Sequence, residues 1–211
     1  MRELLENLDN YADRIRKDLE KKDSAREKVL PLCRELIRYA SITIRAIHRH
    51  EFEEAQKLLG EGRKVREELE QAVSECEELR YHGFVRDAQK EYTEANAVFA
   101  LVTGEPLPDP DDLQVDYTAY LNGLGDTVGE LRRYLLDNMR HGDLEHCEDL
   151  LSAMDDIYTV LVTMDFPDAI TGGLRHTTDQ VRGILEKTRG DITMAVRQQE
   201  LERKLDQSQR Q

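Results

Sequence analysis

The chain is poor in the residues that mark several large classes of protein. It has no tryptophan, 5 prolines and 3 cysteines in 211 residues. The cysteines are isolated and odd in number, with no CxxC pair, so we expect buried free thiols in a reducing compartment. No HExxH motif occurs, and we expect no histidine metal site. No apolar run approaches the roughly 18 residues of a membrane-spanning helix, so we expect no membrane partner.

Signals for strands and for export are missing as well. The alternation of β-branched and aromatic residues that marks strands does not occur, whereas apolar residues recur at spacings of three and four almost throughout. The N-terminal segment is amphipathic and acidic but has no apolar core, so we expect no targeting peptide and a cytoplasmic location. The pattern predicts an all-α protein.

We expect one domain over residues 1–211, because no shift in composition marks a boundary. Its polar C-terminal tail, about residues 202–211, is expected to fray. The apolar periodicity predicts a bundle of about seven helices. They cover approximately residues 3–22, 24–49, 51–79, 81–103, 113–140, 144–164 and 167–205.

Four carboxylates form two helical pairs. Glu91 and Glu94 are three residues apart in KEYTEANAVF, and Asp126 and Glu130 are four apart in GLGDTVGELRR. Such spacings place both members of a pair on one face of a helix. Two such helices side by side would bring together four acidic oxygen donors. That set suits a hard divalent cation and phosphodiester hydrolysis assisted by it.

The two pairs differ in what surrounds them. Glu91 falls inside the apolar stripe of its helix, where a carboxylate is costly unless it is paired, hydrogen-bonded or metal-bound. Asp126 and Glu130 lie opposite the apolar stripe of theirs, so taken alone they favour a solvated face. Gly129 lies on the same side as Asp126 and would let another helix or a ligand come close.

Basic residues gather on two segments, although the formal net charge of −14 argues against a generic surface for nucleic acid. Arg34, Arg38 and Arg45 recur on one face of the second expected helix. The string ELRYHGFVR adds a second group, which consists of Arg80, Tyr81, His82 and Arg86. Arginines fork onto phosphates, and Tyr81 could stack on a base. Taken alone, the pattern favours a solvated face that is salt-bridged to the chain's many acids.

Longer strings carry a resemblance to a known family. EYTEANAVF, followed after a Pro/Asp loop by DYTAYLNGLGDTVGELRR, resembles the Trax branch of the translin/Trax family. RELIRYASITIRAIHR is similar to the family's N-terminal half, and TGGLRHTTDQVRGILEKTRGDITMAVRQQELE is similar to its archaeal members. The similarity covers about residues 25–200. Translin itself lacks the full acidic set and mainly binds nucleic acid, so the four acids indicate Trax.

The resemblance implies a seven-helix fold and a Mg²⁺-dependent endoribonuclease that acts on small RNA. It assigns one or two Mg²⁺ or Mn²⁺ ions to the four acids, and flanking phosphates to the residues of the two basic segments. The ions would activate a water. The family's form further implies a closed, hollow homo-oligomer, an octamer, that handles RNA on its inner wall. Single-stranded DNA is a further ligand that the resemblance implies.

The apolar residues also suggest assembly. Several helices carry them beyond one stripe, and exposed patches of that kind usually mark interfaces. The clearest case is the last helix, where five residues widen the apolar face: Leu174, Ile184, Leu185, Met194 and Val196. We therefore expect a large closed homo-oligomer.

Two other classes of function stay open. One is a non-catalytic oligomer of translin type that binds RNA or single-stranded DNA. It would show steeply salt-dependent binding without metal-stimulated cleavage. The other is a helical scaffold for protein partners, in which the acids are merely structural.

Overall fold

The computed structural model describes residues 7–209, which contain helices and no strand. The long helices are α1 (Leu8–His48), α2 (Phe52–Ser74), α3 (Gly83–Thr103), α5 (Tyr117–Arg140), α6 (Glu145–Thr163) and α8 (Leu174–Gln209). The short ones are η2 (Glu77–Tyr81), a 3₁₀ helix, α4 (Pro110–Leu113) and α7 (Asp168–Thr171). The all-α prediction is confirmed. No helix within residues 7–209 is long and apolar enough to cross a bilayer.

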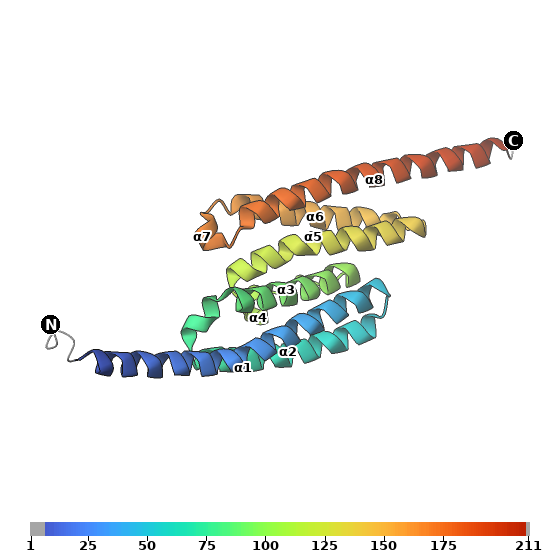
Figure 1. Cartoon of the computed structure of the whole chain (residues 1–211). Helices are drawn as coiled ribbons and strands as arrows, with labels where there is room; N and C mark the ends of the chain where they lie inside the picture. The colour runs from blue at the N-terminus through green and yellow to red at the C-terminus, as the bar shows by residue number, and fades with distance from the viewer. Residues whose placement is uncertain (1–6, 210–211) are drawn as a thin grey trace.

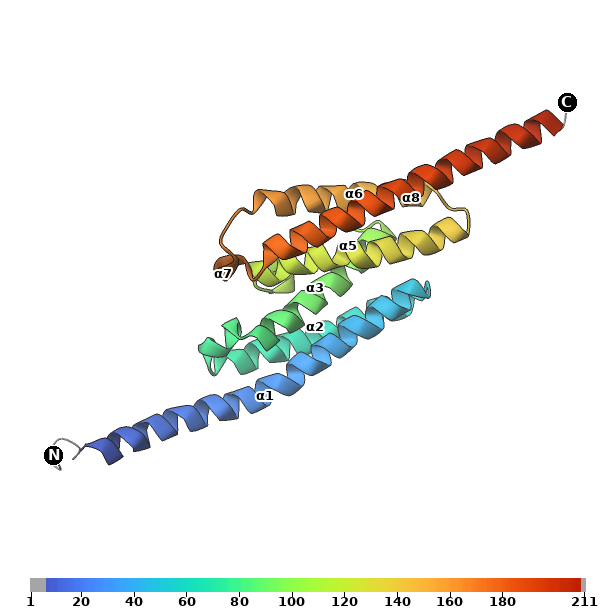
Figure 2. The same ribbon diagram turned by 45° about the horizontal axis from the view of Figure 1, so that its top comes forward.

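The long helices stack in layers (Figures 1 and 2). Helix α1 packs on α2 and α3, α3 packs on α5, and α5 packs on α6 and α8. The N-terminal half of α1 and the C-terminal half of α8 extend past the layered body at opposite ends (Figure 2). Helices α3 and α5 therefore form the centre of the molecule.

Helix α3 is buried along most of its length because neighbours cover it on opposite sides. Two apolar clusters meet along it, one with α1 and α2 and the other with α5, α6 and α8. Small residues such as Ala88, Ala95 and Ala97 are fully buried there, which lets the flanking helices approach closely. Three polar side chains of α3 are consequently buried: Gln89, Thr93 and Glu94.

Two glycines of α5 allow close approach to its neighbours. A methyl group at Gly123 would lie 2.7 Å from the backbone oxygen of Lys90 on α3. A methyl group at Gly125 would collide with the side chain of Thr177 on α8. Gly129 has nothing within 4 Å of a methyl position, so its bare backbone faces open space.

Several helix boundaries differ from the sequence-based expectation. The first two expected helices are one helix, α1, because residues 1–30 contain neither glycine nor proline to separate them. The third ends at Ser74 and is followed by η2. The last begins only at Leu174, because Gly172 and Gly173 adopt positive φ angles of 62° and 89° and end α7. Helix α8 continues to Gln209, so the tail expected to fray is helical up to that residue.

The expectation for the apolar face of α8 is wrong for most of its residues. Leu174 and Leu185 are buried, and Ile184 and Val196 pack half-buried against the core. Only Met194 is exposed, at 70 %. The reason is that α8 packs on both α5 and α6, so a wide apolar face meets two neighbours instead of one.

The three cysteines carry free thiols. Cys33 and Cys147 are buried as expected, whereas Cys76 is half-buried. Burial raises the pKa of the Cys33 thiol to about 12, so it stays protonated at neutral pH and behaves as a small apolar side chain.

Candidate functional site

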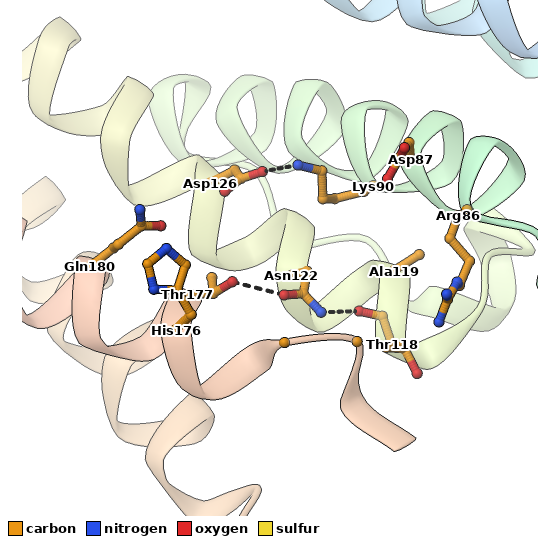
Figure 3. A pocket seen from close by; sticks show the side chains of 13 residues that line it. Arg86, Asp87, Lys90, Thr118, Ala119, Asn122, Asp126, His176, Thr177 and Gln180 are labelled. Carbon is orange, nitrogen blue, oxygen red and sulfur yellow. Dashed lines mark hydrogen bonds and ion pairs between the residues drawn. The ribbon is translucent and has the colours of Figure 1, made fainter. Parts of the chain in front are cut away.

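The two acidic motifs lie on adjacent helices, α3 and α5, and Lys90 joins them (Figure 3). Its Nζ lies 2.6 Å from Oδ2 of Asp126 and 4.0 Å from Oε1 of Glu91. Because both oxygens lie within 4.0 Å of one nitrogen atom, the Glu91 and Asp126 carboxylates are neighbours across the helix pair. The side chains of Glu91 and Asp126 are each about one-third exposed.

Glu94 is the most buried carboxylate of the four, with 8 % exposure. Burial, and to a smaller extent the negative charges of Glu91, Asp126 and Glu130, together raise its pKa to about 8. Burial likewise raises the pKa of Glu91. The mutual influence shows that the four carboxyls form one electrostatic cluster. The sequence singled out Glu91, but α3 is covered on two sides, and Glu94 lies deeper.

Glu130 is held by a residue from a distant part of the chain. Nε2 of His48, near the end of α1, lies 2.5 Å from Oε2 of Glu130. The hydrogen bond with His48 lowers the pKa of Glu130 despite its burial. The His48 ring is buried, and its Nδ1 has no hydrogen-bond partner among the described residues. The alternative in which Asp126 and Glu130 form a solvated face is therefore wrong, since both are half-buried and paired.

The cluster has the chemistry of a cation site without the closed arrangement of one. As the side chains lie, no three His, Cys, Asp or Glu side chains within residues 7–209 gather closely enough to hold a metal ion. Yet four carboxylates make an all-oxygen donor set, which is the kind that Mg²⁺ prefers. Burial lowers the pKa of Lys90, but its hydrogen bond to Asp126 and the charges of Asp126, Glu91 and Glu94 outweigh that effect and raise it. The ammonium group of Lys90 thus supplies the positive charge that a metal ion would supply between these acids. The oxygen donor set fits Mg²⁺.

A cleft of about 380 Å³ opens beside Asp126 (Figure 3). We call it the basic cleft. Arg86 and Lys90 line it from α3, His176 and Gln180 line it from α8, and Asp126 lies at one end. The turn formed by residues 172–173 closes the far side with bare backbone. Asp87 of α3 lines the cleft as well, so two basic and two acidic side chains, together with neutral polar groups, surround this space.

A second cleft, of about 610 Å³, adjoins the first, and we call it the acidic cleft. Glu94 and Gly129 line it together with Lys187 of α8. Asp126 and Gln180 line both clefts. The carboxylate cluster therefore lies where two polar clefts meet.

Asn122 fixes the turn that borders the basic cleft (Figure 3). Its buried Nδ2 donates to the backbone oxygens of Thr118 and Thr171, each at 2.9 Å. Its Oδ1 accepts a hydrogen bond of 2.8 Å from Thr177 Oγ1. This network ties α7 and the start of α8 to α5. The two glycines of the turn are needed because their φ angles are positive.

The predicted basic segments contribute unequally. Arg86 lines the basic cleft. Arg80 is held in ion pairs with Glu70, at 2.6 Å, and Glu77, at 3.0 Å. Tyr81 and His82 are exposed just before and at the start of α3. The other three residues are exposed on α1 and line neither cleft: Arg34, Arg38 and Arg45.

Sequence reasoning missed several residues of the site. Lys90 carried a readable signal, because it lies four residues after Arg86 on the same helical face and directly before Glu91. His48 lies 82 residues from Glu130, and Asn122 lies 55 residues from Thr177. Helical periodicity gives no information about contacts at such separations.

Layered helices with acids on the two central ones define an all-helical protein of translin type. AfC3PO has the same fold in two solved structures, a complex with duplex RNA and a crystal structure. Their sequences are 36 % and 34 % identical to this chain, with TM-scores of 0.78 and 0.79. Each match covers 88 % of this chain and 96 % of AfC3PO. The chain belongs to the translin/Trax family.

Two further comparisons found similar proteins. The uncharacterized protein MJ0175 of Methanocaldococcus jannaschii is 31 % identical over 192 residues, which cover 90 % of this chain and 85 % of that protein. The crystal structure of apo-NeC3PO is 19 % identical, with a TM-score of 0.77, over 87 % of this chain and 96 % of NeC3PO, so it shares the fold. No family model matches the chain.

Proposed function

We propose that this protein is a Mg²⁺-dependent endoribonuclease that cleaves small RNA at the carboxylate cluster of α3 and α5. The observation that carries the proposal is that the Glu91 and Asp126 carboxylates, from adjacent helices, lie side by side, and that Asp126 lines a cleft with Arg86, Lys90 and His176. The solved complex of AfC3PO with duplex RNA supports RNA as the class of ligand.

The four acids would hold the metal. Glu91 and Asp126 face the same ammonium group, and Glu94 and Glu130 share their electrostatic cluster. When bound, Mg²⁺ or Mn²⁺ would activate a water and stabilise negative charge on the phosphate. His48 would orient Glu130, as residues behind a metal ligand usually do.

The basic cleft would hold the RNA phosphates. Arg86 reaches into it from α3 and His176 lies across it on α8 (Figure 3). The bare backbone of residues 172–173 leaves room for a sugar–phosphate chain to come close. Because the whole chain carries a net charge of −14, RNA would bind only where local positive charge offsets that repulsion, as Arg86 and Lys90 would do in this cleft.

We infer that the chain acts as a closed homo-oligomer of the kind the family resemblance implies. The extended half of α1 exposes an apolar stripe: Leu8, Tyr11, Ile15 and Leu19. The extended half of α8 exposes Leu201 and Leu205. In the single chain these residues contact water, and packing against a second copy would bury them.

The non-catalytic alternative has one observation in its favour. Asp126 and Glu130 are already paired with Lys90 and His48, and no three ligands gather in the described part of the chain. A translin-type shell that binds RNA or single-stranded DNA without cleaving it would need no more than the basic cleft.

One experiment separates these functions. Purified protein is incubated with a labelled small RNA in buffer with Mg²⁺, without metal, and with Mg²⁺ plus EDTA, and RNA binding is measured in parallel. We expect cleavage with Mg²⁺ alone and binding in all three. RNA binding without cleavage in the Mg²⁺ sample would overturn the nuclease and leave the translin-type role. Neither binding nor cleavage would indicate a protein scaffold.

A further inference from the structure

We propose that Lys90 is a built-in counter-ion that competes with the divalent cation, so that metal binding must displace its ammonium group from Asp126 and Glu91. The inference rests on the proposed metal site and adds a residue that sets its affinity.

The position of Lys90 carries the inference. It follows Arg86 by one helical turn and directly precedes Glu91, so α3 delivers a positive charge to its own acidic motif. Its Nζ is 2.6 Å from Asp126 and 4.0 Å from Glu91, and its side chain is 30 % exposed. A half-buried pair of this kind is less screened by water and salt than a surface pair.

The ammonium and a metal ion compete for these carboxylates. Mg²⁺ and Mn²⁺ bind carboxylate oxygens at about 2.0–2.2 Å, and a second positive charge within a few ångströms repels them strongly. The lysine hydrogen bond also occupies an oxygen lone pair that a metal would use. Metal binding therefore has to break the Lys90–Asp126 ion pair. The free energy needed to break the pair lowers the measured affinity for the metal.

The cleft offers the displaced ammonium a place to go. Lys90 lines the basic cleft with Arg86 and His176, where the proposed RNA phosphates would lie (Figure 3). Its long, flexible side chain can leave Asp126 without unfolding α3. The other lysine near the acids, Lys187 of the acidic cleft, has no ion pair in the part of the chain that the structure describes. It therefore provides a matched control for loss of one positive charge.

The test is calorimetric titration of Mn²⁺, without RNA, into the full-length protein and three variants. We expect Lys90→Met to bind Mn²⁺ about tenfold more tightly than the wild type, which corresponds to the loss of one competing ion pair. Lys90→Arg keeps the charge and should stay within about threefold of the wild type. Lys187→Met should also stay within about threefold, because its charge competes for no carboxylate.

A second readout protects the test against a folding defect. The rise in melting temperature on addition of Mn²⁺ should be larger for Lys90→Met than for the wild type, since the stabilisation by a bound ligand grows with the logarithm of its affinity. Lys90→Gln replaces Lys90→Met in both measurements if the latter fails to fold. Equal or weaker Mn²⁺ binding by the neutral variants, with binding by the wild type, would overturn this inference alone. No Mn²⁺ binding by any form would overturn the metal site itself.

Discussion

At the scale of single residues, the half-buried charges come in pairs from different elements. Lys90 faces Asp126, His48 faces Glu130, and Arg80 faces Glu70. A charge removed from water needs such a partner, because an unpaired one costs several kcal/mol or neutralises instead. Glu94 is neutralised instead, since its pKa is raised to about 8. The cluster is therefore short of positive charge at Glu94, where a cation would be most effective.

The pair of Glu70 and Arg80 predicts how stability depends on pH. Hydrogen bonds from Arg80 hold the pKa of Glu70 below the usual value of 4.5 for a glutamate. The ionised pair therefore contributes stability above that pH, and the contribution is lost as the pH falls through the lower folded value. Glu70→Gln should lower the free energy of unfolding at pH 7 by up to about 1 kcal/mol, given the exposure of Glu70.

Urea unfolding at neutral and acidic pH checks this prediction. The difference between wild type and Glu70→Gln should shrink as the pH falls below about 4.5. Glu68→Gln, an exposed position on the same helix, should show no such trend. A difference that stays constant with pH would mean that the pair contributes no stability through its charge.

At the scale of elements, the glycines of α5 set how closely three helices approach. Gly123 lies against α3 and Gly125 lies against α8, so α5 touches both neighbours within the turn that leads to Asp126. Gly129 faces the acidic cleft instead. Each glycine lowers helix stability by roughly 1 kcal/mol relative to alanine, so the gain has to come from packing or from access to the site.

These different surroundings predict opposite effects of the same substitution. Gly123→Ala places a methyl 2.7 Å from a backbone oxygen that cannot move aside, and should destabilise the fold by about 1–3 kcal/mol. Gly129→Ala meets open space and should stabilise it by up to about 1 kcal/mol. Urea denaturation of both variants measures the two effects. Equal changes for the two would contradict the packing described for α5.

The sequence predicted the helices that carry the acids better than it predicted the contacts between them. Helical spacing placed Glu91 with Glu94 and Asp126 with Glu130, and the acids do lie on adjacent helices. The same spacing could not reveal that α3 is covered on both sides, so it misjudged which acid is deepest. It also gave no sign of His48 behind Glu130. Periodicity shows which face a residue occupies, but the element that covers the face depends on long-range packing.

At the scale of the whole molecule, exposed apolar side chains follow both extended helix ends, and a second group lies along α6 and α7: Val160, Val162, Phe166 and Ile170. Leu8, Ile15 and Leu19 are each more than half exposed on the extended half of α1. The apolar face of α8 that the sequence analysis expected at a subunit interface is instead buried within the chain, where it packs on α5 and α6. Apolar surface for assembly therefore remains on the two extended helices and on the outer side of α6 and α7.

Assembly predicts a mass well above that of one chain. Light scattering in moderate salt should give a multiple of 24.5 kDa for the wild type. Ile15→Glu puts a charge into the apolar stripe and should reduce the mass, because a buried unpaired charge is costly. Lys17→Glu introduces the same residue on the opposite side of α1 and should leave it unchanged. A wild-type mass near 24.5 kDa would rule out the closed oligomer.

The most direct test of the central claim is the rate of Mg²⁺-dependent RNA cleavage by Asp126→Asn and Glu91→Gln, with RNA affinity measured on the same samples. An amide is a poorer Mg²⁺ ligand than a carboxylate, so cleavage should fall by at least about 100-fold. RNA affinity should stay the same or increase, because each change removes a negative charge beside the basic cleft. Cleavage at the wild-type rate by both folded variants would contradict the claim that this cluster is the nuclease site.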